Sequence, residues 1–417
     1  MMKYSMTKAL LAMSVVFFVG CGGGSLEQPA NETVVGGEVV VDLDGETIKQ
    51  SLLQAGTPGV DASTTVYGYK AYKIPYKTTD EEGNIVDVSG LMVVPTGVPE
   101  AMTAAGFSLV SDSHGTIFAN WEAPTEIASL TNAPDGAPVI LTSLAAFVTL
   151  QADYIGFGDS VDHYHPFVLK KSLANATVDF IKAAKEFASN NNIPLNGQLF
   201  LTGYSEGGYA SVAALEKIEN EGELQVTVAA PMAGPYIMDG LAAQVLSLDT
   251  LSVPSFMADV AYAYTKAYGQ EITSVLNEPY ASKLDGLFDG TKTRLEIDPE
   301  LTTVTTGPDG LFTESFVSGF FSGNWFTLAA NENNVHTWGP STPVKLLHCK
   351  GDDVIPYDIS VYTQQTMVGY GAQSVELIPV EDTLGLGTTV GHAECALLAY
   401  GIAANIFAQT RQATIGY

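Results

Sequence analysis

The chain has 417 residues, 46% of them hydrophobic, enough to bury the core of one large domain with an insertion or of two domains. It carries 46 acidic and 18 basic residues, and a surface with a net charge of −28 repels nucleic acids and anionic lipids. We therefore exclude nucleic acid as a partner. The 41 glycines and the absence of repeats or low-complexity tracts are typical of a globular α/β protein.

The first residues have the pattern of an export signal. MMKYSMTK carries two lysines, and ALLAMSVVFFVG is an apolar stretch too short to cross a bilayer as a helix. Cys21 follows and precedes a glycine-rich stretch, an arrangement that resembles a bacterial lipoprotein signal peptide over residues 1–20. We expect an exported protein of the bacterial cell envelope, anchored to the membrane by lipid on Cys21. Ordinary signal-peptide cleavage, which would give a secreted protein, is the alternative.

The next part of the chain alternates between strands and helices. Residues 21–60 are expected to form a flexible tether and the first segment of the fold, with a strand in VVGGEVVVDL. The β-rich runs at 66–80 and 84–95 predict an antiparallel hairpin. Further strands are predicted in GFSLVSDSHG, AAFVTLQADYIGFGDS, QLFLTGYS and LQVTVAAPMAG, and helices at 169–192 and 207–222.

The alternation lapses over residues 241–340, which are rich in helix formers, aromatic residues and Met. It resumes with the strand and loop PVKLLHCKGDDVIP, a helix, the strand SVELIPVED and a closing helix that starts at GHAEC. We therefore predict an α/β fold with a mostly parallel, doubly wound sheet and an N-terminal antiparallel hairpin. Residues 61–240 and 341–417 would form its core, and 241–340 a helical cap or lid inserted between two strands.

The stretch GYSEGG at residues 203–208 places three glycines around Ser205, where a strand is predicted to turn into a helix. Gly-x-Ser-x-Gly at such a turn lifts the serine hydroxyl clear of the sheet, at the positive end of the next helix. A chain rich in glycine and serine can contain this pattern by chance. The position of the pattern, after an apolar strand and before a helical run, is what makes Ser205 a candidate nucleophile.

A serine hydroxyl does not ionise at neutral pH, so it needs a base, and the base needs an orienting acid. In a doubly wound sheet of the hydrolase kind these partners follow in the order Ser, acid, His. Asp352 and Asp353 lie in the loop after a late strand, and His392, in the loop after the last strand, is the only histidine beyond them. We predict that His392 is the base and that Asp352, rather than Asp353, is the acid.

An oxyanion hole must also be present, because attack on a carbonyl places negative charge on its oxygen. One donor is expected to be the main-chain N–H of Glu206, the residue after the nucleophile. The second is expected from SDSHGTIF, which resembles the His-Gly oxyanion loop of lipases and esterases. Gly115 or Thr116 would donate through its main-chain N–H while His114 shapes the loop; alternatively, His114 merely packs.

With these motifs in place, the chain resembles the α/β-hydrolase superfamily from the hairpin to the C-terminus. LLHCKGDDVIP resembles the H-G-x-x-D-x-x-V-P loop common in that superfamily, with Cys349 in place of Gly, and this match selects Asp352. ADYIGFGDS, GYSEGGYAS and GHAEC resemble secreted, capped bacterial hydrolases of the lipase/esterase type. The resemblance implies a serine hydrolase that cleaves carboxylic esters, of small molecules or lipids, through an acyl-enzyme. We expect the protein to be a monomer.

Two rival functions share much of this pattern. A serine peptidase of the same fold would use the same triad, and a surface-binding lipoprotein without catalysis could keep the scaffold. The proposed chemistry needs no cofactor. DHYH at 162–165 has no convincing metal-ligand spacing, so we expect no metal site and treat it as a structured loop near the site entrance.

Two cysteines flank the proposed acid and base. Cys349 lies three residues before Asp352, and Cys395 three after His392. If the two loops meet, these cysteines come close enough to form a disulfide in an oxidising compartment; otherwise they are two buried free thiols. The aromatic runs MADVAYAYTKAYG and FVSGFFSGNWF could line an acyl pocket, although we expect most of their residues to form the core of the cap.

Overall fold

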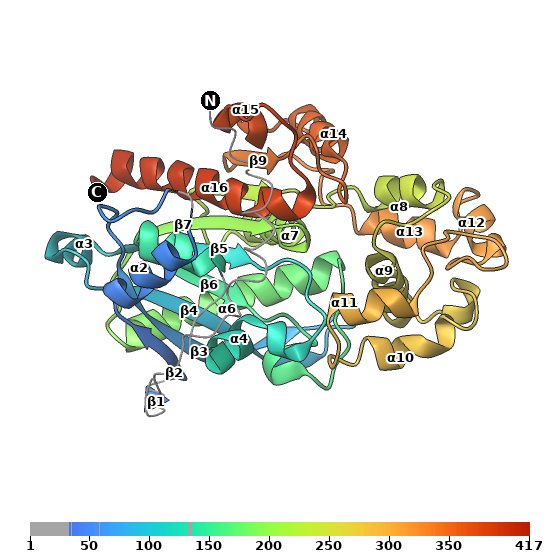
Figure 1. Cartoon of the computed structure of the whole chain (residues 1–417), viewed down its shortest axis with the longest axis horizontal. Coiled ribbons are helices and arrows are strands. Elements are labelled where there is room, and N and C mark those ends of the chain that lie inside the picture. The colour runs from blue at the N-terminus through green and yellow to red at the C-terminus, as the bar shows by residue number, and fades with distance from the viewer. Residues whose placement is uncertain (1–32, 35, 58, 132–135) are drawn as a thin grey trace.

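The computed structural model describes residues 33–34, 36–57, 59–131 and 136–417. The predicted signal peptide and Cys21 lie outside the described residues. The described chain forms one ten-stranded sheet in the order β1-β2-β3-β4-β6-β5-β7-β8-β9-β10 (Figure 1). The strands are β1 (Thr33–Val34), β2 (Gly37–Leu43), β3 (Gly68–Thr79), β4 (Ile85–Thr96), β5 (Phe107–Ser113), β6 (Val148–Ala152), β7 (Leu195–Tyr204), β8 (Val228–Met232), β9 (Val344–His348) and β10 (Val375–Pro379).

The sheet begins antiparallel and continues parallel. β3 and β4 pair antiparallel along their whole length, from Gly68 opposite Thr96 to Thr79 opposite Ile85. β4 also pairs antiparallel with β6, whereas β6, β5, β7, β8, β9 and β10 are parallel to their neighbours. The predicted α/β fold with an N-terminal hairpin and a mostly parallel sheet is therefore confirmed.

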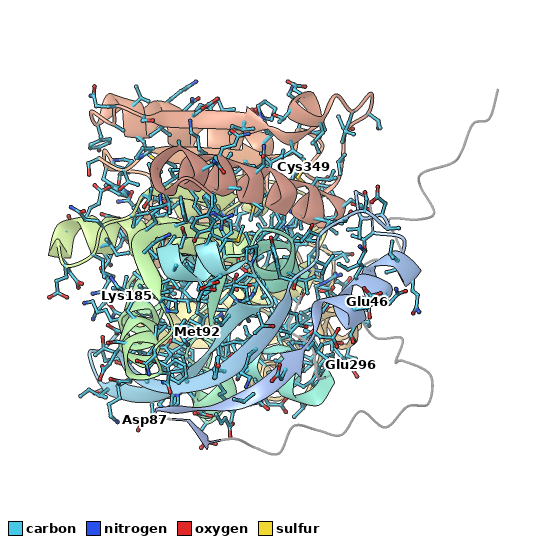
Figure 2. The ribbon with its side chains drawn as sticks, turned by 90° about the vertical axis from the view of Figure 1, so that its left-hand side faces the viewer. Glu46, Asp87, Met92, Lys185, Glu296 and Cys349 are labelled. Carbon is cyan, nitrogen blue, oxygen red and sulfur yellow. A yellow bond between two sulfur atoms is a disulfide. The ribbon has the colours of Figure 1, made fainter. Side chains whose placement is uncertain are left out.

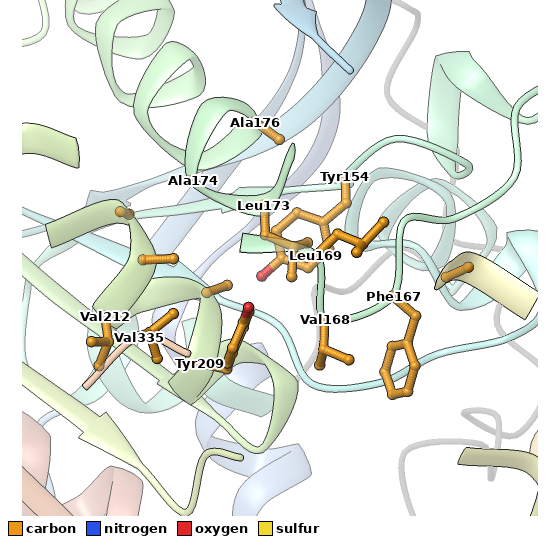
Figure 3. Packing of buried hydrophobic residues seen from close by; sticks show 14 of the residues in the cluster. Tyr154, Phe167, Val168, Leu169, Leu173, Ala174, Ala176, Tyr209, Val212 and Val335 are labelled. Carbon is orange, nitrogen blue, oxygen red and sulfur yellow. The ribbon is translucent and has the colours of Figure 1, made fainter. Parts of the chain in front are cut away.

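Helices cover both faces of the sheet. One face carries α6 (Lys170–Asn190), α7 (Glu206–Glu221) and α14 (Tyr357–Gly369), and the other carries α2 (Gly45–Gln54), α4 (Pro124–Thr131) and α16 (His392–Ile415). Figure 3 shows the first face from close by, where Leu173 and Ala176 of α6 belong to the same buried cluster as Tyr209 and Val212 of α7. Shorter helices are α3 (Glu100–Ala105), α5 (Gly136–Pro138) and α15 (Val380–Leu384).

The segment between β8 and β9 adds no strand to the ten-stranded sheet in the part of the chain described. We call residues 241–340 the insertion; Figure 1 shows its helices gathered at one end of the molecule. They are α8 (Met238–Leu246), which starts just before it, α9 (Pro254–Ala267), α10 (Leu284–Leu287), α11 (Arg294–Ile297), α12 (Glu314–Phe320) and α13 (Trp325–Glu332). The buried Tyr209 hydroxyl of α7 donates to the carbonyl of Asn333 at 2.7 Å, and this bond ties the insertion to the core.

Among the described residues, no helix has both the length and the apolar character needed to cross a bilayer.

Candidate active site

Ser205 occupies the turn between β7 and α7 in a conformation that few non-glycine residues adopt. Its φ of 59° and ψ of −121° lie outside the regions favoured for L-residues, and such strain costs about 1–3 kcal/mol. Two main-chain hydrogen bonds hold the turn: Ser205 N–H donates to Met232 O at 2.9 Å, and Tyr209 N–H donates to Ser205 O at 3.1 Å. The side chain reaches a cavity between the sheet and the insertion.

The flanking glycines are needed because the turn packs against neighbouring backbone. A Cβ atom at Gly207 would overlap the carbonyl oxygen of Ser113, at the end of β5. A Cβ atom at Gly203 would overlap the carbonyl oxygen of Gly207. The Gly-x-Ser-x-Gly pattern is therefore a packing requirement of the strained turn.

His392 and Asp352 converge on Ser205 from loops at the carboxyl ends of other strands. His392 Nε2 lies 3.0 Å from Ser205 Oγ, and Nδ1 lies 2.6 Å from Asp352 Oδ2. His392 is the first residue of α16, and Asp352 follows β9. The carboxyl ends of parallel strands meet at one edge of the sheet, which is why three residues so far apart in the chain can meet here.

The two neighbouring aspartates do different things. The other oxygen of Asp352, Oδ1, accepts hydrogen bonds from the N–H groups of Val354 and Ile355 at 2.9 and 2.7 Å. Asp353 Oδ1 instead accepts from the main-chain N–H of His392 at 2.9 Å, at the start of α16. Asp352 thus contacts the imidazole ring, while Asp353 fixes the backbone that carries it.

A second histidine, His348, also contacts Asp352. Its Nε2 lies 3.1 Å from Asp352 Oδ2 and 3.0 Å from Ile355 O, and its Nδ1 lies 2.7 Å from Ser360 Oγ. Because Nε2 faces two acceptors, it carries the proton, and Nδ1 accepts from the serine hydroxyl. Burial raises the pKa of the Asp352 carboxyl, but the hydrogen bonds from His348 and His392 outweigh burial and hold that pKa below its usual range. In the sequence, His348 stands out only as the histidine of the H-G-x-x-D-x-x-V-P-like loop, and nothing there predicts its contact with Asp352.

Two links join the loop of Asp352 to the loop of His392. Cys349 and Cys395 form a disulfide with their Cα atoms 6.0 Å apart, and Cys349 lies beside α16 (Figure 2). The buried carboxylate of Glu381, in α15, accepts hydrogen bonds from both loops. Its donors are the main-chain N–H groups of Lys350 at 2.9 Å, Gly351 at 3.2 Å and Val390 at 3.1 Å. No sequence pattern marked Glu381, because its partners are main-chain groups that any residue supplies.

The loop after β5 lies against the turn that carries Ser205. A Cβ atom at Gly115 would come within 3.9 Å of Ser205 Cβ, and Thr116 lines the same cavity as Ser205 and Glu206. Glu206 is the first residue of α7, so its main-chain N–H has no acceptor within the helix. The buried His114 ring places one nitrogen 2.8 Å from Gly115 O and the other 3.2 Å from Asp153 O, and so holds the loop to the end of β6.

The cavity beside Ser205 has a volume of about 240 Å³ and is mainly apolar. Its floor includes Ser205 and Asp352, and the insertion supplies most of the rest of its wall. The apolar wall residues from the insertion and the start of α8 include Met238, Leu241, Val245, Phe256, Met257, Val260, Phe312, Phe316 and Phe326. Some residues of the two aromatic runs therefore line the cavity, such as Phe316 and Phe326. Others, such as Tyr264 and Phe320, do not line it and are buried in the hydrophobic core.

The chain is similar to known proteins both in sequence and in fold. A family model described as Secretory lipase matches residues 139–398. A hydrolase from Legionella pneumophila superposes with a TM-score of 0.80 at 24% identity, covering 92% of this chain and 99% of that one. The rice cell wall degrading esterase LipA from Xanthomonas oryzae gives 0.75 at 21% identity, with coverages of 93% and 98%. Candida antarctica lipase A gives 0.56 at 15% identity, with coverages of 78% and 73%. No curated protein matches the sequence.

The Glu381→Ala variant tests the link between the two loops. Three part-buried main-chain N–H groups would lose their acceptor, and a buried donor left unsatisfied costs about 1–3 kcal/mol. We expect the free energy of unfolding, measured in urea, to fall by about 1–3 kcal/mol, and hydrogen exchange at Lys350, Gly351 and Val390 to accelerate. Glu186→Ala, which removes an exposed carboxylate from α6, is the control and should change neither quantity. Equal stability and exchange in the two variants would contradict the assigned role.

Proposed function

The chain belongs to the secretory lipase family and is a carboxylic ester hydrolase, and we propose that it cleaves esters through an acyl-enzyme on Ser205. The observation that carries this proposal is the distance of 3.0 Å between His392 Nε2 and Ser205 Oγ, with Asp352 bonded to the opposite side of the ring. That arrangement is the one needed to turn a neutral alcohol into a nucleophile.

In the first half of the reaction, Ser205 Oγ attacks the ester carbonyl as His392 Nε2 takes its proton. Asp352 holds Nδ1–H and stabilises the positive charge on the imidazolium. The imidazolium then donates its proton to the leaving alkoxide, so that the alcohol departs and the acyl group stays on Ser205. In the second half, His392 removes a proton from water, which attacks the acyl carbonyl. The carboxylic acid is released and the Ser205 hydroxyl is restored.

The negative charge of each tetrahedral intermediate is stabilised at the start of α7. The N–H of Glu206 is one donor, and the N–H of Gly115 or Thr116 is the other. Each donor contributes on the order of 3 kcal/mol to lowering the barrier. The positive end of the α7 dipole adds to this stabilisation because Ser205 directly precedes the helix.

The substrate is an ester with an apolar acyl group. This follows from the mainly apolar wall that the insertion builds beside Ser205. The insertion therefore acts as the cap that selects the acyl group. Membership of a secretory family supports export of the chain, and the N-terminal pattern supports a lipid anchor on Cys21.

The Ser205→Ala variant tests the nucleophile. We expect kcat/KM for 4-nitrophenyl esters to fall by at least about 10⁴-fold, with thermal unfolding close to that of the parent. Ser189→Ala, on the exposed side of α6, should keep full activity. Turnover by purified Ser205→Ala at the parental rate would contradict the assignment of Ser205 as the nucleophile.

The preferred substrate separates the two rival enzyme classes. Faster hydrolysis of peptide amides than of esters by the parent would favour a peptidase instead.

The Cys21→Ser variant tests the anchor. When the full chain is produced in bacteria fed a labelled fatty acid, we expect label and membrane association for the parent and neither for the variant, because only the cysteine thiol accepts lipid. Ester hydrolysis should be equal in both. Equal labelling of parent and variant would contradict lipidation at this position.

A further inference from the structure

A second cavity lies on the other side of α9. It has a volume of about 480 Å³ and a mainly polar lining. Phe256, Met257 and Val260 of α9 face the cavity beside Ser205, whereas Asp259, Tyr262 and Lys266 face the second one. The two sets follow the helical repeat, so α9 is a wall shared by an apolar cavity and a polar one. The proposed ester hydrolysis does not use the second cavity.

Asp259 is the unusual group in this cavity. Its side chain is only 4% exposed, and no described residue forms a hydrogen bond or salt bridge with its carboxylate. An ionised carboxylate in such a place is costly unless a cation joins it. The charges that affect Asp259 are those of His165 and Glu206.

Those two groups are already paired with each other. His165 Nε2 lies 2.7 Å from Glu206 Oε1, and its Nδ1 lies 2.9 Å from the carbonyl oxygen of Ile155. Both ring nitrogens face acceptors, as they would in a doubly protonated ring. Burial lowers the pKa of His165, but the charge and hydrogen bond of Glu206, together with the charge of Asp259, outweigh burial and raise it. His165 is hydrogen-bonded to Glu206 and not to Asp259, so no cation among the described side chains is bonded to the Asp259 carboxylate.

The rest of the lining combines acidic and aromatic side chains. Asp162, Asp285 and Asp289 add carboxylates, and Tyr164, Tyr262 and Phe288 add rings. The Lys266 ammonium lies 4.8 Å from the centre of the Tyr262 ring and 3.3 Å from Asp285 Oδ1, which shows that an ammonium group fits between a ring and a carboxylate at this cavity. Lys266 and Asp285 are exposed, with 44% and 83% of their side chains accessible, and this pair leaves Asp259 without a bonded cation.

We propose that the second cavity binds a small organic ammonium ion, with its charge beside Asp259 and its carbon atoms against the aromatic side chains of the lining. A carboxylate supplies the charge, and aromatic faces attract the polarised methyl or methylene groups of such a cation. No three acidic, His or Cys side chains among the described residues are placed to hold a metal ion, so the lining suits a cation recognised by charge and rings rather than by coordination.

The charge state of Asp259 sets the expected pH dependence. Burial raises the pKa of this carboxyl to about 8; the charge of His165 opposes the rise, and the charge of Glu206 adds to it. Below that value the group is mostly protonated, and an ammonium ion must displace the proton. Affinity should therefore rise by about tenfold from pH 7 to pH 9, and binding at pH 7 should release a proton. The other titratable or charged groups facing the cavity are Asp162, His163, Tyr164, His165, Tyr262, Lys266, Asp285 and Asp289.

Isothermal titration of the mature chain with choline, at constant ionic strength, tests the proposal. The uncharged isostere 3,3-dimethyl-1-butanol separates charge from shape. We expect choline to bind, increasingly from pH 7 to pH 9, and the alcohol to bind at least about tenfold more weakly. In Asp259→Asn, which matches the protonated carboxyl in shape, choline affinity should fall at least tenfold and lose its pH dependence.

Two further measurements complete the test. Asp309→Asn removes an exposed carboxylate of the insertion outside the cavity and should bind choline like the parent. Thermal unfolding of Asp259→Asn at pH 6 should match the parent, which rules out misfolding as the cause of lost binding. Equal binding of choline and its alcohol isostere, binding unaffected by Asp259→Asn, or no binding of choline at pH 9 would each overturn the proposal.

Discussion

The hydrogen bond between His392 and Ser205 joins residues 187 positions apart, and the proposed chemistry depends on keeping that bond in place. The serine is fixed by a strained turn that only flanking glycines permit. The histidine is fixed by Asp353 at its backbone and by Asp352 at its ring. The disulfide and Glu381 hold together the two loops that carry Asp352 and His392. The site is therefore positioned mostly by groups that take no part in the chemistry.

The insertion contains a helix that separates two cavities of opposite polarity. Helix α9 presents an apolar face to the cavity beside Ser205 and a polar face, with Asp259, to the second cavity. We propose that each face of this helix serves a different ligand, the apolar face an acyl chain and the polar face a small cation.

Much of the fold could be predicted because most strands and helices are long, strongly patterned runs, such as β7 and α6. The exchange of β5 and β6 in the order of the sheet could not be predicted. Both are equally buried strands, and the hydrophobic periodicity of a strand does not indicate which strands lie next to it. Ser205, Asp352 and His392 could be placed from chain order and loop position, and the structure brings these three side chains together. Glu381 could not be predicted because it contacts main-chain N–H groups, which any residue supplies. Asp259 could not be predicted because no sequence motif marks a single carboxylate buried in a helix.

The most direct test is to determine where a phosphonate ester attaches, by mass spectrometry and then by crystallography of the adduct. The proposed triad predicts one adduct, on Ser205 Oγ, with its phosphoryl oxygen bonded to the N–H of Glu206 and to that of Gly115 or Thr116. An adduct on another residue, or an inert Ser205 in an active enzyme, would contradict it.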